Sequence, residues 1–508
     1  MKHWKLAGST AMMTILAGTG AFAQVTPEEV WQNWQDMTSA YGQSVTAGSV
    51  AREGDTLVVS AVVIAYDKDG VVVNGTIEKM NFADKGDGTV AITMSDTYPI
   101  DVKMPATAGV EGAKPSDLAV TISQPGIVIT ASGTAAATNY EFNGPSIGIK
   151  VESKDAADPT VVNGTFDATM TDTTAKYLVF GDTSAKKITS EFAAKSMTMT
   201  FAGADKTIGS DFAFNATVAD IAGNSNGNFL DAEAMVDIAA ALKAGFAVDG
   251  GFTHGPVTFD LNVNEPEAKT TKIAGTMASG GITVLLDATK LLYGGGNKGV
   301  AFTLSSSNIP VPEVKVGYAE SAFNLLMPVA KSDAPSDFAF LTKLVDFSVS
   351  DDIWAMVDPA GALPHDPATI IIDTKGTARL TADIMDKTAM DALGDAPPGE
   401  LNSLDVTELK ATVAGAELTG AGSFTFDNTD KTTFGGMPAP TGKMDLKVVG
   451  ANTLMDKLVT MGLLSQDDVM GARMMVSMFA NTATDKDEMT STLEFKDKGF
   501  FANGQQLQ

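Results

Sequence analysis

The chain has 508 residues, no cysteine, and 62 acidic against 35 basic residues, which gives a formal net charge of −27 at pH 7. Without cysteine there are no disulfide bonds, no thiolate metal sites and no cysteine catalysis. A surface this acidic repels phosphate backbones, so we expect no nucleic-acid partner. The length is sufficient for one large domain or for several.

Residues 1–23 have the pattern of a secretory signal peptide. Lys2 and Lys5 form a positive start, an apolar stretch follows, and the tripeptide AFA at residues 21–23 is typical of a signal-peptidase site. The sequence therefore predicts cleavage after Ala23 and a mature protein in the periplasm, with export beyond the outer membrane as the alternative. No later stretch reaches the ~20 apolar residues of a spanning helix, so we expect no transmembrane span.

The first predicted element after this segment is an amphipathic helix of about four turns. Thr26 suits the N-cap, Pro27 suits the first helical position, and Glu28 and Glu29 favour the positive end of the helix dipole. Gly42 lies where a helix often ends. Since the polar face is acidic, we expect the two tryptophans on the other face to pack on a sheet and not to touch a membrane.

From Ser49 onward the sequence alternates β-branched runs with Gly, Asp and Asn turns. The first strands are predicted at Thr56–Tyr66, Val71–Phe82 and Thr89–Tyr98. No helix-length segment separates them, so we expect an antiparallel meander. The same pattern recurs along most of the chain.

Helices are predicted at two further places. Residues Asn228–Gly245 carry an N-cap, an apolar face and a closing glycine. Residues 453–464 and 465–480 form a helical hairpin, with Ser465 as the cap of its second helix, and two strands end the chain. The predicted fold class is mainly β (α+β), with large curved antiparallel sheets on which helices at the N-terminus, middle and C-terminus pack. The predicted domains are the signal peptide at 1–23, a first β-region at 24–227 and a second at 228–508.

One segment has the formal pattern of a serine hydrolase. Gly144–Gly148 matches G-x-S-x-G around Ser146, but that motif needs a strand before the serine and a helix after it. Here a strand pattern follows, Pro145 favours a turn, and His254 and His365 lie in hairpin or loop contexts. We therefore expect a turn at Ser146, no enzyme activity and no cofactor, and we keep a serine hydrolase as the weakest alternative.

The stretch "WAMVDPAGALPHDPATIIID", residues 354–373, concentrates prolines and acidic residues. It is interpreted as a short helix capped by Ser350, a break at Asp358-Pro359, and an extended passage into a strand at Thr369–Asp373. The alternative is a carboxylate cluster around a cation. Its residues would be Asp351, Asp352, Asp358 and Asp366, with His365 beside them.

Met470, Met474, Met478 and Phe479 recur at helical spacing in the second helix of the hairpin. Core packing is the first interpretation of this row. Thioethers also suit an adaptable hydrophobic groove, and they are soft ligands for Cu(I). We expect no zinc site of protein ligands, since no histidine pair has metal-ligand spacing.

Several segments together resemble an uncharacterised family of Gram-negative envelope proteins, domain of unknown function 2125. The resemblance extends over nearly all of the mature chain and implies no assigned activity. Its segments are "VTPEEVWQNWQ", "GDTLVV", "VGYAESAFNLLMPVAKSD", "IWAMVDPAGALPHDPATIIID", "GAELTGAGSFTFDN", "MGLLSQDDVMGARMMVSMFA" and "FFANGQQL". In texture the chain is also similar to the AsmA-like envelope proteins, whose long curved sheets imply a hydrophobic groove for lipid.

These observations favour a periplasmic, non-catalytic protein that binds a lipid or another hydrophobic ligand in a groove of the sheet. The alternative is a structural or interaction protein of the envelope with protein partners and no small ligand. The segment "NLLMP" is apolar on both strand faces and should be covered on both. The groove is predicted to be lined by Phe323, Leu325, Leu326, Met327, Met474 and Met478.

Overall fold

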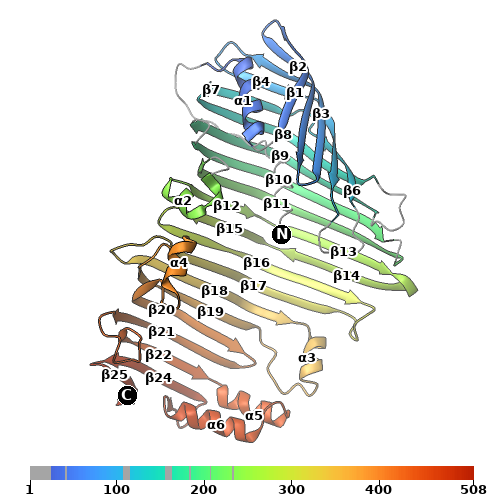
Figure 1. The fold of residues 1–508 in the computed structure, drawn as a ribbon. Coiled ribbons are helices and arrows are strands. Elements are labelled where there is room, and N and C mark those ends of the chain that lie inside the picture. The colour runs from blue at the N-terminus through green and yellow to red at the C-terminus, as the bar shows by residue number, and fades with distance from the viewer. Residues whose placement is uncertain are drawn as a thin grey trace. The chain divides into compact units, whose positions relative to one another are not determined.

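A computed structural model describes residues 24–40, 43–106, 115–154, 163–181, 185–205, 208–230 and 234–508. The predicted signal peptide, with its cleavage site, lies outside these residues, as does Gly42. Every assigned strand pair is antiparallel, and strands far outnumber helices (Figure 1). The predicted fold class, mainly β with antiparallel sheets, is confirmed.

The elements follow one another along the chain in long antiparallel runs. The first part of the chain contains α1 Pro27–Ala40, β1 Ser44–Glu53, β2 Thr56–Lys68, β3 Val71–Asp84, β4 Val90–Met94, β5 Thr97–Met104, β6 Ser116–Ser123, β7 Val128–Thr134, β8 Ala137–Ser153, β9 Asn163–Gly181, β10 Ala185–Asp205, β11 Ser210–Leu230, α2 Ile238–Lys243, β12 Ala247–His254, β13 Val257–Glu265 and β14 Lys269–Met277. Two 3-10 helices lie at Ala234–Val236 and Pro266–Ala268.

The second part of the chain adds helices between long strands. It contains β15 Ser279–Leu286, β16 Lys290–Ser306, β17 Val314–Pro328, β18 Ser336–Val349, α3 Asp351–Val357, β19 Ala368–Leu380, α4 Lys387–Leu393, β20 Gly399–Val413, β21 Ala416–Asp427, β22 Ala439–Val449, α5 Ala451–Thr460, α6 Gln466–Ser477, β23 Asn481–Thr482, β24 Glu488–Lys496, β25 Gly499–Ala502 and β26 Gln505–Gln506. The predicted hairpin and final strands are confirmed.

The chain divides into two compact units. The first holds the described residues up to Met235, together with Val248–Gly275 and Ser305–Pro310. The second holds Val236–Ala247, Thr276–Leu304 and Val311–Gln508.

The first unit has a closed hydrophobic core built around α1. A capping box starts this helix, because Thr26 Oγ1 accepts the N–H of Glu29 at 3.3 Å while the Glu29 carboxylate accepts the Thr26 N–H at 2.9 Å. Trp34 packs edge-on against Phe82 of β3, with ring centroids 5.6 Å apart, and Phe82 is fully buried. Helix and sheet therefore exclude water from each other's apolar faces, as predicted for the two tryptophans.

Two predicted elements have other bounds in the structure. The strand expected at Thr89–Tyr98 is two strands, since β4 pairs with one end of β3 and β5 pairs with the other. The helix expected at Asn228–Gly245 starts later than predicted: Asn228 belongs to β11, where it pairs with β10, and the helical residues are Ala234–Val236 and Ile238–Lys243. The short α2 begins only after Asp237, whose carboxylate accepts the N–H groups of Ala239 and Ala240.

The strands of the second unit form a simple ladder. Beginning at β15, each strand pairs with the next as far as β22, which pairs with β24. In Figure 1, α3, α5 and α6 lie beyond the ends of the strands they connect. Among the described residues, no helix is long and apolar enough to span a membrane.

Candidate functional site: an uncovered apolar sheet face

The register of the second unit places apolar side chains on one face of the ladder. Residues directly opposite each other in an antiparallel pair share a face, so each row can be followed from strand to strand. One row runs Val284, Tyr293, Leu325, Phe340, Thr374, Val406, Gly422, Met444 and Leu493. The next runs Ile282, Gly295, Phe323, Thr342, Ile372, Leu409, Gly420, Leu446 and Ser491.

A third row is small or polar on β15–β17 and apolar from β18 onward. It runs Gly280, Asn297, Ser321, Leu344, Ile370, Ala411, Leu418, Val448 and Met489. We call the surface formed by these three rows the apolar face. None of the three rows contains a charged side chain. With a strand spacing of about 4.8 Å, the eight steps from β15 to β24 extend over about 38 Å.

The apolar face is open to solvent where its side chains are largest. On β15–β19, six of them are each between 37% and 45% exposed, although side chains of this kind are usually buried in a folded domain. Exposed apolar side chains that gather on one face are typical of binding surfaces, so this face is the candidate site. The six are Ile282, Tyr293, Phe323, Leu325, Phe340 and Ile370.

An aromatic pair lies at the centre of this group. The rings of Tyr293 and Phe323 are 5.0 Å apart at 47°. Gly295 is opposite Phe323, and a Cβ at this position would lie 2.7 Å from the carbonyl oxygen of Gly281. Glycine is therefore required for the close approach of β15 and β16, and it leaves bare backbone beside the Phe323 ring.

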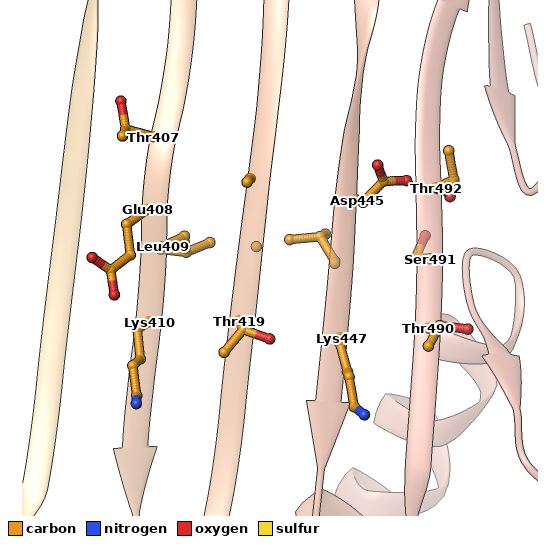
Figure 2. A pocket seen from close by; sticks show the side chains of 13 residues that line it. Thr407, Glu408, Leu409, Lys410, Thr419, Asp445, Lys447, Thr490, Ser491 and Thr492 are labelled. Atoms are coloured by element: carbon orange, nitrogen blue, oxygen red, sulfur yellow. Dashed lines mark hydrogen bonds between the residues drawn. The ribbon is translucent and has the colours of Figure 1, made fainter.

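The other face of the ladder is polar on β20–β24, whereas on β15–β18 it carries the apolar row Leu285, Leu292, Leu326 and Ala339. Lys410, Thr419, Lys447 and Thr490 form one of its rows, and Lys447 pairs with Glu488 at 3.0 Å. Figure 2 shows these side chains around a shallow depression of about 590 Å³ on β20, β21, β22 and β24. Its lining combines both charge signs with threonines, and it lacks the enclosed apolar walls of a small-molecule site.

The structure separates the six predicted groove residues into three places. Phe323 and Leu325 lie on the apolar face, and Met327 lies on the same side of β17 in the next row, opposite Leu291. Leu326 lies on the opposite face, where its partner is Ala339. Met474 belongs to α6 and Met478 to its C-cap, and five strands of the ladder, β18–β22, intervene between β17 and this hairpin.

The sequence did not single out Ile282, Tyr293, Phe340 or Ile370, although a signal was present. Each lies on a strand whose alternation matches that of its neighbour, but only the register shows that the four share a face with Phe323. The methionines were first interpreted as core. That interpretation is wrong for Met470, Met474 and Met478, which are 60–67% exposed.

The acidic stretch near His365 is a hydrogen-bonded turn. The Asp358 side chain is buried, and its two oxygens accept the N–H groups of Ala362 at 2.9 Å and Leu363 at 2.6 Å. These backbone donors lower the pKa of Asp358. His365 stacks on Trp354 with ring centroids 4.4 Å apart.

The alternative carboxylate cluster can be placed residue by residue. Asp351 is almost fully exposed and lies 3.7 Å from the ring of His365, and Asp352 and Asp366 are exposed. Across the described ranges, no group of three or more His, Asp or Glu side chains could hold a metal ion. The predicted helix and strand that flank the turn are present as α3 and β19, but the Ser350 hydroxyl accepts the N–H of Lys315 and does not cap α3.

Ser146 has no hydrolase geometry around it. It lies inside β8, opposite Thr171 of β9, so the turn predicted there is wrong because the strand continues past Pro145. His254 contacts the carbonyl of Gly255 through Nδ1 at 2.8 Å, and His365 is stacked on Trp354. None of the contacts of these two histidines in the described part of the chain is a hydrogen bond to Ser146.

Comparison with known proteins adds one finding. No curated protein matches the chain. Residues 298–502 match the model of a family described as an uncharacterised protein conserved in bacteria (DUF2125), which confirms the predicted family resemblance over the part of the chain that carries most of the apolar face.

Proposed function

We propose that this protein binds a hydrophobic ligand, such as a lipid, on the apolar face of its second unit. The observation that carries the proposal is the exposure of six large apolar side chains on one face of β15–β19, in rows without a charge. Burying such side chains against a ligand yields roughly 25 cal/mol per Å² of apolar surface. The ligand would therefore gain affinity mainly by removing this surface from water.

The proposal includes a non-catalytic role in the periplasm. Lys2, Lys5 and the AFA tripeptide at residues 21–23 support secretion. A hydrophobic ligand needs a carrier in an aqueous compartment, and an acidic protein stays soluble there. Fractionation of cells, followed by N-terminal sequencing, tests this part, with Gln24 as the expected first residue.

The binding test uses N-phenyl-1-naphthylamine, an uncharged probe that fluoresces in apolar surroundings. The double variant Phe323→Ser/Phe340→Ser removes two exposed rings from the apolar face. The matched control is Leu326→Ser, which changes a neighbouring residue of the same strand on the opposite face. Circular dichroism and thermal unfolding verify that all three proteins fold.

We expect the double variant to bind the probe at least about tenfold more weakly, a change of about 1.4 kcal/mol, while the control binds as the wild type does. Equal binding by all three proteins would place the probe elsewhere and refute the site. Native mass spectrometry of protein from a periplasmic extract then identifies what the face carries. A mass without ligand, unchanged after incubation with envelope lipids, would favour the structural or interaction protein instead.

A further inference from the structure

Helix α6 exposes a row of methionines that no part of the described chain covers. Met470, Met474 and Met478 follow each other at intervals of four residues, and Met475 lies beside them; each is at least 60% exposed. The only buried residue of α6 is Val469. Helix α6 therefore uses one narrow side for its own packing and presents a wide apolar side to solvent.

The charges around this row have one sign. The only cation of α6, Arg473, turns toward α5, where it donates to the Asn452 side chain at 2.9 Å and to Asp456 at 2.8 Å. Asp467 and Asp468 are exposed in the first turn of α6. Asp468 accepts the hydroxyl of Ser465 through Oδ2 at 2.6 Å. Within the described ranges no lysine, arginine or histidine forms an ion pair with either carboxylate, so neither negative charge is neutralised by a cation.

We propose that the exposed side of α6 binds a cationic amphipathic helix of a partner protein. Methionine side chains are flexible and polarizable, so they adapt to the apolar side of a docked helix. The two carboxylates select a partner with lysine or arginine beside its apolar stripe, and the negative charge of the whole chain accelerates the approach of such a partner. This inference does not depend on the ligand of the apolar face.

The test measures fluorescence anisotropy of a labelled, 14-residue leucine/lysine amphipathic peptide, with a leucine/glutamate peptide of the same pattern as the opposite-charge control. The full protein is compared with Met474→Ser/Met478→Ser and with Asp467→Asn/Asp468→Asn. Met437→Ser is the matched control, because Met437 is equally exposed in the segment between β21 and β22. Phe323→Ser reports any binding of the peptide to the apolar face.

We expect the methionine double variant to bind the cationic peptide about tenfold or more weakly, since a few buried anchors dominate such interfaces. The aspartate variant should bind more weakly at low salt and lose part of the salt dependence. Met437→Ser and Phe323→Ser should bind as the wild type does, and the glutamate peptide should not bind.

Three results would overturn the proposal. Equal affinity of all variants would show that the peptide binds elsewhere. Loss of binding in Phe323→Ser alone would place the peptide on the apolar face. A wild-type dimer in sedimentation, abolished by Met474→Ser/Met478→Ser but unaffected by the peptide, would assign the row to a second copy of the chain.

Discussion

Strands of the same alternating pattern meet two different environments in this protein. In the first unit, β3 directs Ile77 and Phe82 into a core that α1 closes, and both are at most 1% exposed. In the second unit, Phe323 and Phe340 alternate in the same manner on β17 and β18, yet no helix covers them and about 40% of each remains exposed. Alternation determines which face of a strand is apolar, whereas the cover of that face depends on a separate element.

The two units differ in whether folding alone buries their apolar rows. The covered rows of the first unit gain free energy when the chain folds, because α1 and the sheet bury them together. If the proposed function holds, the uncovered rows of the second unit gain the same kind of free energy only when a ligand covers them. Replacement of a phenylalanine should therefore lower the free energy of unfolding much more in the first unit than in the second.

The largest expected effect follows from Phe82→Ala. The side chain is fully buried between Trp31 and Trp34, so its removal leaves a cavity. We expect the free energy of unfolding to fall by about 3–5 kcal/mol, measured by urea denaturation. A loss similar to that of an exposed phenylalanine would mean that α1 does not close this core.

A smaller, pH-dependent effect is expected for Asp358→Asn. The backbone N–H groups of Ala362 and Leu363 lower the pKa of Asp358 in the folded protein. A lowered folded pKa contributes stability above the unfolded value of about 3.9, and this contribution is lost as the pH falls through the folded pKa. The variant should therefore unfold at a lower temperature than the wild type at pH 7, and the gap should narrow below about pH 4.

The measurement is thermal unfolding of both proteins between pH 7 and pH 3. Other carboxylates titrate in the same range, but they do so in both proteins, so the difference isolates Asp358. A gap that stays constant down to pH 3 would contradict the assigned cause of the shift.

The smallest expected effect on stability follows from Phe323→Ala. The ring is 39% exposed and rests beside bare backbone at Gly295, so no closed cavity forms when it is removed. We expect a loss of about 1 kcal/mol or less in urea, against the several kcal/mol expected for Phe82→Ala. A loss as large as that of Phe82→Ala would show that the apolar face is part of a packed core and would remove the basis of the proposed function.

Local signals in the sequence predicted most elements correctly. Thr26 with Glu29 marked the start of α1, Ser465 marked α6, and its hydroxyl accepts the N–H of Asp468 at 3.1 Å. These signals are reliable because an N-cap side chain accepts a backbone N–H from the first turn of its own helix, so the signal is local in sequence. The helix expected from Asn228 starts later in the structure, because pairing of β11 with β10 outweighs local helix propensity at Asn228.

The sequence by itself determined the class of the protein: an acidic, cysteine-free chain of antiparallel strands, with apolar and polar residues alternating and helices between some strands. Only the tertiary structure decided which rows of those strands become neighbours, because register joins Tyr293 to Leu325 and Phe340 across β16–β18. Tertiary packing also determined which apolar surfaces are covered. The tryptophans of α1 are buried, whereas the methionines of α6 are exposed to solvent. A helical pattern specifies an apolar side but not the element that packs against it.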